Sequence, residues 1–116
     1  MTALSAIETE QLRDLRARLN RVPAGAQGDK SVGPLSKGFF DVCVRTGLPG
    51  AGEASIGQIG EADLATLNGV VAGLRKARED AKTWRPLFDA GVLQAVLTRR
   101  LVLAGKEQPS ETGVRS

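Results

Sequence analysis

A row of small residues spaced four apart constrains the fold of this chain more than any other feature. Residues four apart form a ridge on a helix, and a ridge with almost no side chain lets a second helix approach closely. Each glycine inside a helix costs about 1 kcal/mol relative to alanine, and we expect tight helix packing to offset that cost. The row therefore predicts helix–helix contact, and it predicts that Gly73→Leu weakens this contact sharply. Its members are Ala65, Gly69, Gly73, Ala77 and Ala81.

The N-terminal part of the chain contains one clear helix and one short apolar element. The helix is expected over residues 5–20, where Ser5 and Glu8 match the capping-box pattern. Length and composition do not separate helix from strand over residues 36–46. We favour a helix there, because the chain offers no second convincing strand to pair with it. Gly47 then ends this element as a C-terminal glycine.

The strongest helical pattern spans residues 61–82, and a last helix is expected over residues 86–104 with proline at its first position. A hinge at residues 84–86 would fold these two helices into an antiparallel hairpin. Gly91 and Ala95 offer a small pair on the last helix that matches the small-residue row. The sequence thus predicts an all-α fold, a small bundle of three substantial helices and one short element with the C-terminal hairpin as its core.

The length fits one domain, which we expect to span residues 1–105. Glycine and proline concentrate in two stretches, over residues 22–35 and 47–60, which are interpreted as loops. The polar segment over residues 106–116 is expected to be a disordered tail.

The composition argues against catalysis. The chain has no histidine and no tyrosine, and its single cysteine, Cys43, lies between two valines. Histidine is the side chain best suited to proton transfer near neutral pH, and one cysteine cannot build a structural zinc site. Free cysteine is usually a buried, inert thiol. We therefore expect no enzyme, no cofactor and no metal.

We expect neither a secretory signal nor a membrane span in this chain. Its first ten residues lack a basic segment followed by an apolar run, and no stretch approaches the roughly 18 apolar residues of a membrane span. A cytoplasmic location is the simplest expectation for a chain that cannot form an internal disulfide. Arginine exceeds lysine, a bias typical of GC-rich genomes, so we expect a bacterial-type protein.

The leading hypothesis is a small non-catalytic interaction protein, such as an adaptor, inhibitor or assembly factor. The last helix is apolar nearly all round, so it must be central in the bundle or shared with a partner. We expect the C-terminal hairpin to bind a protein partner or a second copy of the chain, as a homodimer. Besides the small-residue row, the expected anchors are Trp84, Phe88 and Leu97.

The alternative hypothesis is a nucleic-acid-associated regulator or structural protein. The formal net charge is +3, and basic side chains crowd three helical segments, so groups of them that converged could contact a phosphate backbone. Cations near helix C-termini also have a purely structural explanation, because they complement the helix dipole. The residues in question are Arg13, Arg16, Arg18, Arg21, Arg75, Arg78, Lys82, Arg85, Arg99 and Arg100.

Overall fold

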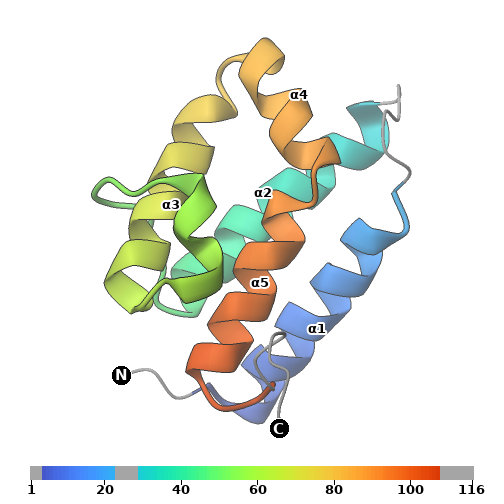
Figure 1. Ribbon diagram of the computed structural model, residues 1–116. Helices are drawn as coiled ribbons and strands as arrows, with labels where there is room; N and C mark the ends of the chain where they lie inside the picture. Colours follow the sequence, from blue (N-terminus) through green and yellow to red (C-terminus); the bar gives the residue numbers. More distant parts are fainter. Residues whose placement is uncertain (1–3, 23–28, 108–116) are drawn as a thin grey trace, which may run out of the picture.

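The computed structural model describes residues 4–22 and 29–107, and over these ranges it is an all-α bundle without strands (Figure 1). The predicted fold class is therefore confirmed. The elements are α1 (Ala6–Asn20), α2 (Asp29–Arg45), the 3-10 helix η1 (Ile56–Glu61), α3 (Leu64–Ala77), α4 (Ala81–Asp89) and α5 (Val92–Leu103).

Helix α1 begins where the capping box predicts. The Glu8 amide donates to Ser5 Oγ at 3.1 Å, and the Ser5 amide donates to Glu8 Oε1 at 3.0 Å. Two otherwise unpaired backbone donors are thereby satisfied. One face of the helix then buries a stripe of leucines in the core: Leu12, Leu15 and Leu19.

Helix α2 is longer than the sequence predicts, because it begins at Asp29 inside the expected loop. The loop prediction is wrong from this residue onward. Pro34 lies in the second turn, where its missing amide removes one hydrogen bond near the start of the helix. The helix ends as predicted: Gly47 has a φ of +95°, and the Leu48 amide donates to the Cys43 carbonyl at 2.7 Å. This is the Schellman arrangement, in which a residue with positive φ closes the last turn.

The helix predicted over residues 61–82 is divided between α3 and α4. Asp80 interrupts the predicted helix by acting as the N-cap of α4. Its Oδ1 accepts a hydrogen bond from the Lys82 amide at 3.0 Å, and its Oδ2 accepts one from Thr83 Oγ1 at 3.0 Å. The short aspartate side chain can accept hydrogen bonds from backbone amides in place of helical carbonyls, so it favours the start of a new helix.

The predicted hairpin hinge is also misplaced. Trp84 and Pro86 lie inside α4, and the chain turns instead at Gly91, which has a φ of +79°. The last helix therefore begins at Val92 rather than at Pro86. Because α4 separates α3 from α5, these two helices are not a direct hairpin.

Helix α5 runs through the middle of the bundle and packs against α1, α3, α4 and η1 (Figure 1). Neighbours on several sides account for its nearly continuous apolar surface. Of the two positions that the sequence allows for this helix, central in the bundle or shared with a partner, the structure has the central one. Its buried residues are Val92, Leu93, Val96, Leu97, Arg100 and Leu101.

Candidate binding surface at the C-terminal end of α3

The small-residue row does not receive a helix. Gly69 is buried, and a Cβ atom placed on it would lie 2.9 Å from the carbonyl carbon of Glu53. The close neighbour is therefore the loop before η1, and the prediction of helix–helix contact is wrong at this position. A Cβ atom on Gly73 would meet nothing within 4 Å, so no neighbour presses against this glycine as the row predicts.

The remaining members of the row do not form a shared surface with Gly69. Ala65 is exposed, whereas Ala77 is half-buried and packs against the core. The side chain of Ala81 lies outside the described part of the structure. The row therefore provides one close contact, between Gly69 and the loop before η1.

The three expected anchors of a protein interface are part of the hydrophobic core. Trp84 is 7% exposed, Phe88 is 6% exposed and Leu97 is fully buried. The Trp84 ring lies 6.1 Å from the rings of both Phe40 and Phe88, measured between centroids. The chain itself covers these residues, so the expectation that they face a partner is wrong.

Two arginines of α1, Arg13 and Arg16, contact the C-terminal segment of the chain. Arg16 Nη1 lies 2.7 Å from Glu107 Oε1, and Arg13 Nε lies 3.3 Å from Glu107 Oε2. The hydrogen bond from Arg16 lowers the pKa of the Glu107 carboxyl group below its usual value. Arg13 Nη2 also donates to the Lys106 carbonyl at 2.6 Å.

These contacts correct one expectation about the C-terminal segment. Lys106 and Glu107 are held against α1, although the sequence predicts disorder from residue 106. Residues 108–116 lie outside the described ranges. Elsewhere on α1, Arg18 pairs with Asp14 at 3.0 Å between Nε and Oδ2, and Arg21 is exposed at the C-cap.

The two arginines of α5 hold neighbouring elements in place. Arg99 Nε donates to the Ala62 carbonyl at 2.8 Å, which ties α5 to the end of η1. Arg100 is buried, and its Nε donates to the Thr46 carbonyl at 2.7 Å. This carbonyl lies at the C-terminal end of α2, where helical carbonyls lack partners within the helix. Burial lowers the pKa of Arg100 below its usual value.

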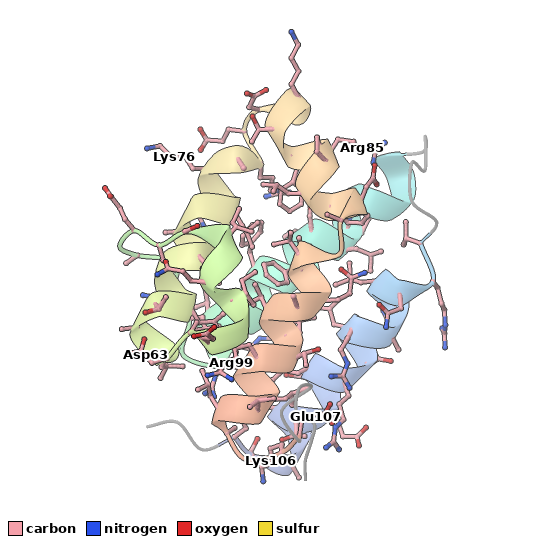
Figure 2. The ribbon with its side chains drawn as sticks, in the orientation of Figure 1. Asp63, Lys76, Arg85, Arg99, Lys106 and Glu107 are labelled. Carbon is pink, nitrogen blue, oxygen red and sulfur yellow. The ribbon has the colours of Figure 1, made fainter. Side chains whose placement is uncertain are left out.

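The predicted basic groups do not converge on one nucleic-acid surface. Figure 2 shows Arg99 near the lower end of α5, while Arg85 lies beside the N-terminal half of α2 at the other end of the molecule. Lys76 points away on the opposite side of that upper end. Lys82 is exposed on α4, and Arg85 is half-buried.

One pair of cations does converge, and we call it the Phe40 arginine pair: Arg75 and Arg78 on α3. Their guanidinium carbons lie over the ring of Phe40 at 5.5 and 5.7 Å from its centroid. Guanidinium groups are attracted to the face of an aromatic ring at such distances. Both arginines are exposed, whereas Phe40 is buried and supported by Phe39, whose ring lies 5.1 Å away in an edge-on arrangement.

Local sequence patterns could not find the Phe40 arginine pair. They identify Arg75 and Arg78 as neighbours on a helix, and Phe40 as an apolar residue of another element. The contact joins residues 35 or more positions apart, and only the packing of α2 against α3 creates it. Lys37 lies one turn before Phe40 on α2 and is exposed.

The thiol of Cys43 is unsuited to nucleophilic chemistry. Cys43 is buried, as predicted. Burial raises its pKa to about 12, and the opposing charges of Arg75 and Arg100 do not reverse that shift. The reactive thiolate is therefore scarce near neutral pH.

The chain matches no protein-family model, no curated protein and no solved structure. Within residues 4–22 and 29–107, no helix combines the length and the apolar character needed to cross a membrane.

Proposed function

We propose that this protein is a non-catalytic interaction protein that binds an acidic surface of a partner protein through the Phe40 arginine pair. The observation that carries the proposal is the convergence of two exposed guanidinium groups on one buried ring. Arginine is enriched at the energetic centres of protein interfaces, and a stacked guanidinium keeps its N–H groups available to a ligand.

The position of the pair favours binding with little loss of conformational freedom. The Phe40 ring is fixed by Phe39 and Trp84. The Arg75 guanidinium carbon lies 3.3 Å from the point that a Cβ atom on Gly50 would occupy, so this loop residue flanks the arginine. Side chains that are already ordered in the free protein lose less entropy when a partner binds.

A protein partner is favoured over nucleic acid by the state of five of the other eight predicted cations. Arg13, Arg16 and Arg18 are paired with carboxylates, and Arg99 and Arg100 donate to backbone carbonyls within the fold. A nucleic-acid interface depends on many phosphate contacts made together. Two converging arginines suit a compact acidic patch better than an extended backbone.

A titration of the ¹⁵N-labelled protein with a glutamate-rich peptide tests this proposal. We expect chemical-shift changes centred on the Nε–Hε groups of Arg75 and Arg78, and we expect them to disappear in the double variant Arg75→Gln/Arg78→Gln. The matched control is Arg18→Gln/Arg21→Gln, which removes the same charge from α1 and should leave binding unchanged.

Two results would contradict the proposal. One is the absence of any localised shift at low salt. The other is preferential binding of a DNA duplex with an affinity that falls steeply as salt rises, which would favour the nucleic-acid alternative.

A further inference from the structure

We infer that the Phe40 arginine pair is a subsite for a phosphate monoester, carried by a phosphorylated serine or threonine of the partner protein. This inference rests on the proposed function and specifies the group that the acidic partner presents. The two positive charges of the pair lack a neutralising carboxylate among the described residues. Arg75 and Arg78 lie over the same ring, and neither forms an ion pair with a carboxylate of the described residues. An anion that contacts both guanidinium groups would offset the repulsion between these like charges.

The number of donors favours phosphate over carboxylate. One guanidinium group can occupy both oxygens of a carboxylate through two parallel hydrogen bonds. A phosphate monoester carries a charge of about −1.5 to −2 at pH 7 and three acceptor oxygens. A single phosphate can therefore form a two-oxygen contact with each arginine at once, whereas a carboxylate has one pair of oxygens and offers a second arginine only single-oxygen contacts.

The surrounding charges determine which groups must supply the affinity. Lys37 is an exposed cation one turn before Phe40 on α2. Asp41 and Glu79 are exposed on the same two segments of chain and oppose an anion, while the Asp80 carboxylate is engaged in capping α4. The C-terminal end of α3 also carries the negative end of its dipole. Binding must therefore come from the guanidinium groups themselves.

The test compares three probes on the full chain: a peptide containing one phosphoserine, the same peptide with glutamate in that position, and inorganic phosphate. We expect the phosphopeptide to bind about tenfold more tightly than the glutamate peptide, because phosphate carries the larger charge and only phosphate can form a two-oxygen contact with both guanidinium groups. The preference should vanish in Arg75→Gln/Arg78→Gln and persist in the control Arg18→Gln/Arg21→Gln. Circular dichroism of each variant verifies that the fold is intact.

A charge-conserving variant distinguishes bidentate hydrogen bonding by the guanidinium groups from electrostatic attraction alone. Arg75→Lys/Arg78→Lys keeps both charges but removes the planar donor forks. We expect its preference for phosphoserine to shrink, because only the difference in charge between the two peptides remains. If it keeps the full preference for phosphoserine, bidentate recognition is wrong.

The outcomes separate this inference from the proposed function. Equal binding of both peptides by the native chain overturns the phosphate subsite and leaves the acidic-partner proposal standing. Binding of neither peptide overturns both. If inorganic phosphate alone binds as tightly as the phosphopeptide, the ligand is a free phosphate, and the assignment to a partner protein is overturned.

Discussion

At the scale of single residues, Gly69 and Gly73 lie one turn apart on α3 but in opposite environments. An added methyl group at Gly69 would meet the Glu53 backbone at 2.9 Å, whereas Gly73 has open space. We expect Gly69→Ala to destabilise the protein, because overpacking costs about 1–3 kcal/mol. Gly73→Ala should stabilise it by about 0.5–1 kcal/mol, because alanine restricts the unfolded chain and favours helix. Urea denaturation of both variants checks this, and a shared direction of change would contradict it.

Cys43 provides a residue-scale prediction with a defined dependence on pH. Its folded pKa of about 12 lies above the ordinary value of 9.0, so the folded state holds the thiol proton more tightly than the unfolded state does. This contribution to stability is fully present below pH 9 and is lost as the pH rises toward 12, with a slope of up to about 1.4 kcal/mol per pH unit.

The measurement is denaturant unfolding from pH 8 upward for the native chain and for Cys43→Ala. The native chain should lose stability more steeply than the variant above pH 9. In a parallel assay at pH 8, iodoacetamide should label Cys43 in urea but scarcely in buffer. Rapid labelling of the folded protein would show that the thiol is accessible, contrary to its burial in the structure.

At the scale of elements, the division between α3 and α4 depends on Asp80. Its carboxylate accepts from the Lys82 amide and from the Thr83 hydroxyl, so Asp80→Ala should cost about 0.5–2 kcal/mol of unfolding free energy. Asp80→Asn should retain most of the stability, because asparagine caps helices about as well as aspartate. Thermal unfolding of the two variants tests this, and equal stabilities would mean that the cap contributes nothing.

The same elements show which structural signals are local in sequence. The Ser5–Glu8 box and the Gly47 terminus are correctly predicted, because each depends on residues within one turn. Asp80 is also a local capping residue, but the apolar periodicity continues across it from residue 61 to residue 82 and hides the break. Pro86 compounds the error, since proline is typical of a first helical turn but here lies inside α4.

At the scale of the whole molecule, the fold class is predictable and the binding surface is not. The abundance of apolar residues at helical spacing indicates a helical bundle whatever the exact boundaries. The candidate site requires knowing that α2 passes α3 with Phe40 beneath Arg75 and Arg78, which no local pattern encodes. The same packing buries Trp84 and Phe88, two of the residues that the sequence assigns to an interface.

The central position of α5 changes the expected oligomeric state. The sequence favours a homodimer because the last helix is too apolar for one neighbour to cover, but α1, α3, α4 and η1 together cover it. The large hydrophobic side chains exposed within the described ranges are Ile7, at 72%, and Val44, at 51%. They lie on different helices, and scattered apolar residues of this kind are normal on a monomer surface.

We therefore expect light scattering to give the mass of a single chain across a wide range of protein concentrations. The double variant Ile7→Ser/Val44→Ser should behave identically, because in a monomer neither side chain contacts a second copy. A mass that rises toward two chains in the native protein and returns to one in the variant would identify an apolar dimer interface at these residues. A dimer that persists in the variant but dissociates at high salt would instead indicate pairing through charged surfaces.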